Sequence, residues 1–220
     1  MKRAMVLAAV FVILLAGGIW YVWNDYHQFL DQPFGEKAAG VILDVEPGMS
    51  GRAVIVRLAT LGVTEYGWQW RILLRSRPVL LKAGEYQLEP GLTPPGMLNK
   101  VARGDVIHYR FTIVEGWTWR ALSSAIQADP MLGRAIDHEV SATDLPEAAA
   151  AFGSLEGAFL PETYLYTRSD SAVDLLNRAF KAMQSSLSKA WTMRTDQHPV
   201  KTPYELLVLA SIIEKETALA

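Results

Sequence analysis

The amino-terminal stretch that decides the architecture carries no charge and reads Ala4-Met-Val-Leu-Ala-Ala-Val-Phe-Val-Ile-Leu-Leu-Ala-Gly-Gly-Ile-Trp-Tyr-Val-Trp23. A helix of this length, at about 1.5 Å per residue, crosses the roughly 30 Å hydrocarbon core of a bilayer. Lys2 and Arg3 precede the stretch, so the positive-inside rule places the N-terminus in the cytoplasm and the bulk of the chain outside it. We therefore expect residues 1–23 to form a cytoplasmic tip and a single-pass membrane anchor.

A cleaved signal peptide is the alternative interpretation of the same stretch. Its apolar region is normally about 7–15 residues long and ends at a small-residue site. Ala16-Gly17-Gly18 offers such residues, but apolar and aromatic side chains continue beyond them. This continuation favours the anchor, and the length without charge makes a buried helix of a soluble protein the poorest fit.

Composition narrows the class of protein. The chain has 220 residues, 50% of them hydrophobic, with a formal net charge of −2 and no cysteine. This length suits one large or two small domains. The near-neutral charge argues against a general nucleic-acid binder. Without cysteine there is no disulfide framework, zinc-thiolate site or thiol nucleophile.

The first half after the anchor is expected to be a polar linker followed by a small domain. Pro33 and Gly35 mark the linker, residues 24–40. Turn dipeptides, helix-capping residues and apolar periodicity then predict the next elements. They are a strand at 40–46, a helix at 50–61, a helix at 66–75, a strand at 84–88 and a helix at 93–104.

The second half is predicted to mix longer helices with a strand. Residues 106–114 alternate so that Ile107, Tyr109, Phe111 and Ile113 share one face, which is typical of a strand. The remaining predictions are a helix after Thr118, a weak signal at 127–158, a loop or short strand at 159–166, a helix from Ser171 towards Trp191, and a helix after Thr202.

The last helix has the strongest start signal in the chain. Thr202-Pro-Tyr-Glu205 is a capping box with proline at the first helical position. The following residues, Leu206-Leu-Val-Leu-Ala-Ser-Ile-Ile213, are apolar on nearly every side, which predicts burial on most sides. The helix then presents Glu214, Lys215 and Glu216 in succession.

Helical geometry distinguishes the two glutamates. Glu216 projects towards Ile212 and Ile213 of the preceding turn, which predicts a partly desolvated carboxyl with a raised pKa, as a proton donor requires. Glu214 emerges about 200° away, so the two cannot flank one substrate bond as a pair. The alternative is that this Glu-Lys-Glu run is simply the solvated end of the helix.

The residues from Thr202 to Thr217 resemble the active-site helix of the membrane-anchored endolytic murein transglycosylases, the YceG-like or MltG family. Further pieces agree in order, and together they cover nearly the whole chain from the anchor onward. They are Glu46-Pro-Gly48, Lys82-Ala-Gly-Glu-Tyr86, Val114-Glu-Gly-Trp117, Glu156-Gly157 and Pro161-Glu-Thr-Tyr164.

The resemblance implies an α+β fold in which residues 41–105 form a small LysM-like βααβ domain and residues 106–220 the start of a mixed α/β catalytic domain. Family members continue well beyond the Glu-Lys-Glu-Thr helix, so we expect the catalytic domain to be incomplete at the C-terminus and this chain to be inactive or only partly folded. It also implies a bacterial inner-membrane protein whose bulk is periplasmic.

The resemblance further implies a lyase that cuts peptidoglycan glycan strands between N-acetylmuramic acid and N-acetylglucosamine with 1,6-anhydro ring formation, and so ends strand elongation. The second glutamate of the motif, Glu216, is then the catalytic acid. No metal or cofactor is required, and the implied partners are glycan strands, the membrane and cell-wall synthesis enzymes, without nucleic acid. Weaker substrate-binding candidates are Trp117, Glu162 and Tyr164.

Two other functions stay open at this stage. Ser211 and Lys215 lie one helical turn apart, as a serine nucleophile and a lysine base of a hydrolase would. A membrane-anchored scaffold that binds glycan without catalysis is the second. No two of His27, His108, His138 and His198 have metal-ligand spacing.

Overall fold

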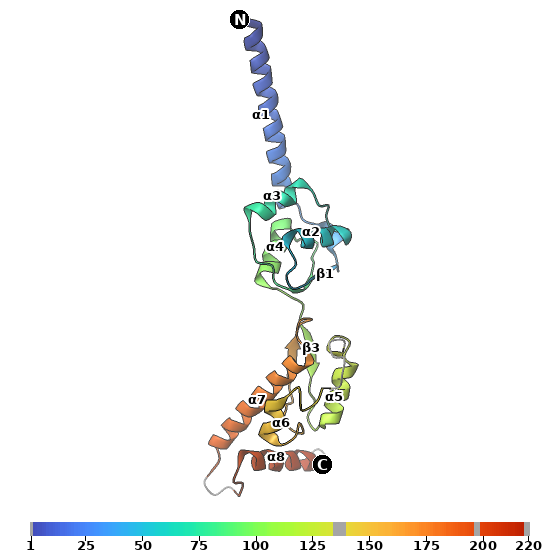
Figure 1. Ribbon diagram of the computed structural model, residues 1–220, viewed down its shortest axis with the longest axis vertical. Helices are drawn as coiled ribbons and strands as arrows, with labels where there is room; N and C mark the ends of the chain where they lie inside the picture. Colours follow the sequence, from blue (N-terminus) through green and yellow to red (C-terminus); the bar gives the residue numbers. More distant parts are fainter. Residues whose placement is uncertain (1, 134–139, 196–198, 218–220) are drawn as a thin grey trace. The chain divides into compact units, whose positions relative to one another are not determined.

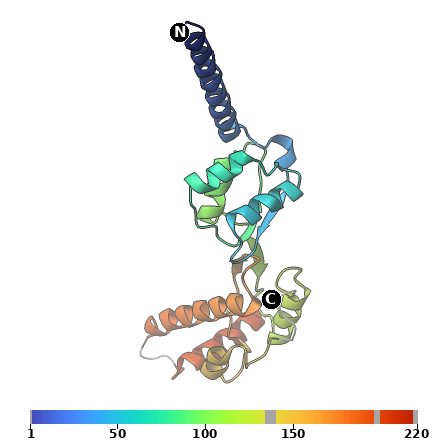
Figure 2. The same ribbon diagram turned by 45° about the horizontal axis from the view of Figure 1, so that its top comes forward.

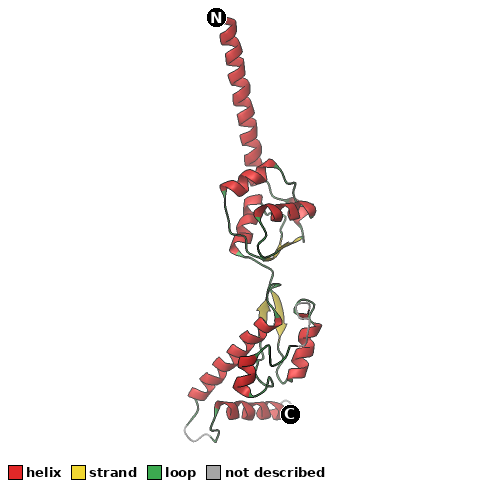
Figure 3. Cartoon of the chain, in the orientation of Figure 1, coloured by secondary structure: helices red, strands yellow, loops and turns green. Residues whose placement is uncertain are grey.

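The computed structural model describes residues 2–133, 140–195 and 199–217. Helices dominate, and two small antiparallel sheets accompany them (Figure 3), which confirms the expected α+β class. The chain divides into two compact units, Met1–Ile107 and His108–Ala220. Each unit has its own hydrophobic core.

Helix α1 (Lys2–Asp31) contains the expected anchor. Within it, Ala9–Asp31 is long and apolar enough to span a membrane, and none of that stretch is buried. The expected linker at 24–40 differs from the structure, because it holds the end of α1 and the short helix η1 (Gly35–Ala38). Its apolar side chains explain the difference, since Phe29 and Phe34 pack against the core of the first unit.

After η1 the first unit continues with a strand, two helices, a strand and a helix (Figure 1). These are β1 (Ile42–Val45), α2 (Gly51–Thr60), α3 (Trp68–Ser76), β2 (Gly84–Gln87) and α4 (Pro94–Arg103). Strands β1 and β2 pair antiparallel, with Leu43 opposite Tyr86. The predicted strand–helix–helix–strand order is confirmed. The predicted caps also form, since Ser50 accepts a hydrogen bond from Ala53 N and Thr93 accepts one from Gly96 N.

Two large aromatic residues centre the core of the first unit. Trp70 is fully buried, and its Nε1 donates a hydrogen bond to Thr64 Oγ1 at 3.0 Å. Tyr86 is also fully buried, and its hydroxyl donates to the carbonyl oxygen of Lys82 at 2.8 Å. Burial, assisted by the negative charge of Asp105, raises the pKa of Tyr86 above its ordinary value. Both polar atoms therefore keep a partner inside an apolar core.

Gly84 of the Lys82–Tyr86 motif is required by the backbone. Its φ is +144°, and a Cβ there would collide with Cγ1 of Val106. We expect Gly84→Ala to lower the free energy of unfolding by about 2–3 kcal/mol, from backbone strain and overpacking combined. Gly48→Ala is the control, because its φ of +79° carries strain while nothing lies within 4 Å of its Cβ position. Urea unfolding of both variants measures the difference, and equal losses would contradict the packing argument.

The second unit is built around strands β3 (Tyr109–Thr112) and β4 (Thr163–Tyr166), which pair antiparallel with Phe111 opposite Tyr164. Its helices are α5 (Trp119–Ala128), α6 (Pro146–Phe152), α7 (Ala172–Thr192) and α8 (Pro203–Thr217). Phe111 and Ile113 are buried on the predicted face. β3 is shorter than the predicted strand at 106–114, because the N–H of Ile107 bonds to Glu85 O of the first unit instead.

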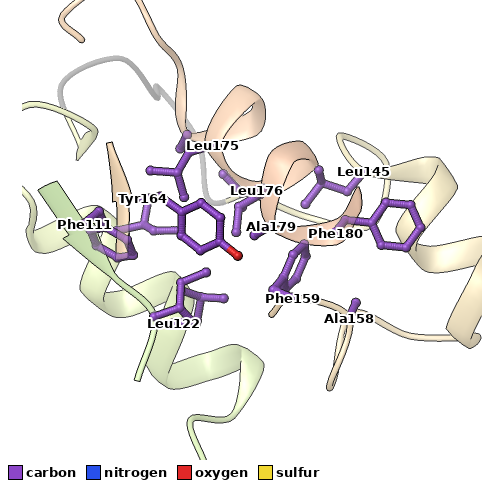
Figure 4. Packing of buried hydrophobic residues seen from close by; sticks show 14 of the residues in the cluster. Phe111, Leu122, Leu145, Ala158, Phe159, Tyr164, Leu175, Leu176, Ala179 and Phe180 are labelled. Atoms are coloured by element: carbon purple, nitrogen blue, oxygen red, sulfur yellow. The ribbon is translucent and has the colours of Figure 1, made fainter. Parts of the chain in front are cut away.

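Helix α7 supplies the largest share of the second core. Figure 4 shows Leu175 and Leu176 of α7 beside Tyr164, which lies next to Phe111 of the other strand, and Phe180 farther along the helix. Phe180 also meets Phe152 edge-on, with ring centroids 6.0 Å apart. The core therefore fixes the sheet against α7.

Ser171 and Asp174 form the predicted capping box at the N-terminal start of α7. Their mutual hydrogen bonds lower the pKa of Asp174. This stabilisation is complete above the ordinary pKa of an aspartate and is lost as the pH falls through the lowered value. We expect Ser171→Ala to cost about 1 kcal/mol at pH 7 and to return the pKa of Asp174 towards its ordinary value. Urea unfolding and an NMR titration measure both effects, and exposed Ser185→Ala should change neither.

The predicted burial of α8 is wrong for the described part of the chain. Helix α8 contacts α7, and the two helices run at an angle to each other in both views (Figures 1 and 2). Val208, Ile212 and Ile213 nevertheless remain 41%, 55% and 53% exposed. The physical reason is that apolar side chains surround the helix, whereas its described neighbours cover only part of its circumference.

Candidate active site

The second unit contains a cavity of about 360 Å³ between α8 and the segments that flank α5. Its lining is largely apolar and aromatic, with a few charged groups at α8 and before Phe159. The residues are Ile113, Val114, Gly116, Trp117, Thr118, Trp119, Leu122, Leu155, Glu156, Gly157, Phe159, Pro161, Met183, Tyr204, Leu207, Val208, Ala210, Ser211, Glu214 and Lys215. An apolar hollow with few polar groups is the usual form of a ligand site.

Helix α8 contributes one carboxylate, that of Glu214, to the lining of this cavity. Leu207, Ser211 and Glu214 follow one another at helical spacing and line it together. Oε1 of Glu214 lies 3.4 Å from the position that a Cβ on Gly116 would occupy. Gly116 has a φ of +75°, a conformation that glycine adopts readily. The turn after β3 thus places the backbone of Gly116, which has no side chain, next to the Glu214 carboxylate.

Glu216 is placed differently. Like Glu214 it is exposed, but it is not among the residues that line the cavity. The expected desolvation is wrong within the described residues, because Ile212 and Ile213 are themselves more than half exposed. The predicted separation of the two glutamates holds, since the cavity includes Glu214 alone of the two. Whether Glu216 is catalytic stays a prediction.

A second carboxylate reaches the cavity from the turn before Ala158. Oε2 of Glu156 accepts a hydrogen bond from the backbone N–H of Trp119 at 2.9 Å, at the start of α5. A carboxylate in this position is favoured by the free N–H groups at the helix start. Glu156-Gly157 belongs to the family-like motifs, but its place in the site was not predicted. Its partner lies 37 residues away, so no local pattern reveals the contact.

Two tryptophans add ring surface to the cavity. Trp117, predicted as a substrate-binding candidate, lines it and is 37% exposed. Trp119 also lines it, with its ring centroid 5.5 Å from that of Phe159. Aromatic side chains of this kind offer large apolar faces with a polar N–H at one edge.

The other two predicted candidates lie elsewhere. Tyr164 is buried in the core, and its hydroxyl donates to Leu160 O at 2.8 Å. Burial, with the negative charge of Glu162 as a smaller cause, raises the pKa of Tyr164 to about 12, so its proton stays bound at neutral pH. Glu162 is exposed and does not line the cavity. The structure therefore gives Tyr164 a packing role.

The serine–lysine pair shares the cavity wall without hydrogen bonding. Ser211 and Lys215 both line the cavity, but the hydroxyl of Ser211 donates to Val208 O at 2.8 Å. Among the described side chains, no hydrogen bond joins Ser211 to Lys215. A lysine base would need that contact to activate a serine nucleophile.

The histidines give no metal centre in the described part of the chain. His27 and His108 lie in different units, while His138 and His198 fall outside the described residues. Among residues 2–133, 140–195 and 199–217, no three His, Asp or Glu side chains gather closely enough to hold a metal ion.

Comparison with known proteins confirms the resemblance that the motifs indicate. The model of the YceG-like family matches residues 43–220, from β1 to the end of the chain. A 2.6 Å crystal structure of a yceG-like protein from Listeria monocytogenes is similar over 80% of this chain, with 22% sequence identity and a TM-score of 0.38. This chain spans 64% of that protein's chain. The comparison with curated proteins gives no match.

Proposed function

Because the chain belongs to the YceG-like family, we propose that it is an endolytic lytic transglycosylase. Its substrate is the nascent glycan strand of peptidoglycan, cut between N-acetylmuramic acid and N-acetylglucosamine, and the cut ends strand elongation. The observation that carries the proposal is the family match over residues 43–220, which includes α8 with Glu214 and Glu216. Fold alone does not give function, so the roles below rest on individual residues.

In the proposed mechanism one carboxyl group serves twice. Glu216 first donates its proton to the glycosidic oxygen, and the bond from that oxygen to the anomeric carbon of the muramyl residue breaks. The resulting carboxylate then accepts the proton of the muramyl 6-hydroxyl, whose oxygen bonds to the anomeric carbon and closes the 1,6-anhydro ring. Ordinary glycosidases need a second carboxylate for an attacking water or a covalent intermediate. Here the muramyl 6-hydroxyl of the substrate itself is the nucleophile, so no second carboxylate is needed.

The cavity beside α8 supports a role in holding sugar rings. Trp117 and Trp119 present ring surface, and Glu156 offers a carboxylate fixed by the Trp119 N–H. Glu214 lies against the turn at Gly116, so we assign it the positioning of this turn beside the substrate. The catalytic and positioning carboxylates then stand on two faces of one helix.

The first unit and α1 complete the proposal. The order β1-α2-α3-β2 is that of the LysM-like domain implied by the family, so we assign glycan binding to this unit. Helix α1 is assigned as an uncleaved anchor in the bacterial inner membrane, with the N-terminus in the cytoplasm and both units in the periplasm. Such an anchor would hold the enzyme beside the cell-wall synthesis enzymes that extend the strands.

Product analysis tests the proposal. The full-length protein, in detergent or nanodiscs, is incubated with uncrosslinked glycan strands, and the products are identified by mass spectrometry. We expect ends that carry 1,6-anhydro-muramic acid. Reducing ends would indicate a hydrolase and overturn the transglycosylase assignment.

The same assay separates the other candidates. Loss of cleavage in Ser211→Ala, with cleavage kept in Glu216→Gln, would favour the serine–lysine hydrolase. Strand binding without any cleavage by the full-length protein would favour the scaffold. The hydrogen bond from Ser211 to Val208 O argues against the hydrolase.

A further inference from the structure

Four arginines gather on one surface of the first unit. Arg52, Arg71, Arg75 and Arg77 are exposed and surround a shallow hollow beside the half-buried Tyr66, and we call these four residues the arginine face. The guanidinium carbons of Arg52 and Arg71 lie 5.7 and 5.5 Å from the centroid of the Tyr66 ring. Cation–π contacts at these distances hold the two side chains in place.

The charge of the arginine face is not neutralised within the described protein. None of the ion pairs between described residues includes any of its four members. The acidic residues nearest to them in sequence are Glu46, Glu65 and Glu85. Of these, Glu46 forms its ion pair with Arg57, which is not a member of the arginine face. An excess of positive charge on an exposed surface attracts anionic partners.

Helix α3 combines this charge with exposed apolar side chains. Trp70 and Leu73 face the core, whereas Trp68 and Ile72 are 38% and 44% exposed. At 100° per residue, Trp68, Ile72, Arg71 and Arg75 fall within about 100° of one another on the outer face. Leu80, in the loop after α3, is 83% exposed. Arginine mixed with tryptophan and aliphatic residues is typical of helices that lie in a membrane interface.

The start of α3 lies next to the end of the membrane anchor. The rings of Tyr26 and Trp68 are 6.2 Å apart, those of Phe29 and Trp70 are 5.2 Å apart, and Gln69 donates to Asp25 at 2.9 Å. Tyr26 follows Trp23, the end of the uncharged stretch, by three residues, or about 4.5 Å along the helix axis. The contacts therefore bring α3 to the level at which α1 leaves the apolar layer.

We propose that the outer face of α3, the arginine face and Leu80 rest on the anionic phospholipid headgroups of the bilayer that α1 enters. The arginines bind lipid phosphates, while Trp68, Ile72 and Leu80 enter the boundary between headgroups and acyl chains. This inference rests on the proposed membrane insertion of α1 and adds a second, charge-dependent contact with the same surface. The consequence is that the first unit is held against the bilayer surface by this face as well as by α1.

The experiment uses the full chain in lipid vesicles. Because the chain has no cysteine, Ile72→Cys gives a single site for an environment-sensitive fluorophore. Ile42→Cys on β1 is the matched control, since Ile42 is 48% exposed and Ile72 is 44% exposed. Vesicles of phosphatidylcholine alone, or of phosphatidylcholine with phosphatidylglycerol, carry a lipid quencher just below the headgroups.

We expect strong quenching at position 72 only in vesicles that contain phosphatidylglycerol, and little quenching at position 42 in either. Replacing Arg71, Arg75 and Arg77 by glutamine should shift the docked equilibrium by about 100-fold, the effect of three basic residues at an anionic membrane. Replacing the same three by lysine should restore docking. Salt near 1 M, where the Debye length is about 3 Å, should release position 72.

Controls separate this inference from insertion itself and from misfolding. Flotation of the protein with phosphatidylcholine vesicles tests insertion of α1 and is independent of the arginine face. Removing three charges from the second unit, at Arg110, Lys181 and Lys189, should leave quenching unchanged. Arg75→Gln with Arg77→Gln avoids the Tyr66 contacts and should still reduce docking. Equal quenching at position 72 in both vesicle types, or no change in the glutamine variants, would overturn the proposal.

Discussion

Glu216→Gln is expected to reduce the rate of transglycosylation by about 10²- to 10⁴-fold, the usual contribution of a positioned general acid or base. The amide keeps the size of the side chain but neither releases a proton to the glycosidic oxygen nor accepts one from the muramyl 6-hydroxyl. Because the same group serves both steps, kcat should fall while KM changes little. Initial rates of anhydro-end formation across a range of strand concentrations measure both constants.

Glu214→Gln is the matched control on the same helix. Both glutamates are exposed, but Glu214 lines the cavity against Gly116, whereas Glu216 lies on another face of α8 and does not line it. As a positioning residue, Glu214 should lose less than about 10-fold on amide substitution, since glutamine can keep contact with the turn. The reverse result, with Glu214→Gln inactive and Glu216→Gln active, would transfer the catalytic role to the carboxylate inside the cavity.

Trp70→Ala is expected to remove about 3–5 kcal/mol from the stability of the first unit. Trp70 is fully buried, its ring lies 5.2 Å from that of Phe29, and its Nε1 donates to Thr64. The substitution therefore leaves a cavity, removes the hydrogen bond to Thr64 Oγ1 and loosens the end of α1. Hydrogen exchange of peptides from residues 1–107, followed by mass spectrometry, reports the loss separately from the second unit.

Two further substitutions serve as controls, and each should lower the stability of the first unit by less than Trp70→Ala does. Trp68→Ala, two residues earlier on α3, removes a side chain that is 38% exposed and should cost less than about 1 kcal/mol in detergent. Trp70→Phe keeps much of the packing but not the hydrogen bond, and its loss should be intermediate. Equal losses at positions 68 and 70 would contradict the burial argument.

Helix starts were predictable because their interactions are local. Ser50, Thr93, Thr118 and Ser171 each cap the N–H three residues ahead, as the sequence indicates. These contacts need only the correct residue at a fixed short spacing. The same holds for the positive-φ glycine that ends α4, Gly104.

Contacts between distant segments were not predictable in the same way. The sequence predicts a loop or a short strand at 159–166, and β4 forms there because it pairs with β3, so that Phe111 lies opposite Tyr164. The stretch at 24–40 was expected to be a linker, yet Phe29 and Phe34 pack against Trp70. In each case the deciding partner lies more than 30 residues away.

The sequence by itself determined where helices start, which faces of the amphipathic elements are apolar, that α1 is long enough to cross a bilayer, and which family the chain resembles. Local spacing and composition decide these properties. Only the tertiary structure decided that α8 is largely exposed among the described residues, that Glu214 instead of Glu216 enters the cavity, and that Glu156 joins it through Trp119 N. Burial and cavities arise where segments distant in sequence meet, so no local pattern encodes them.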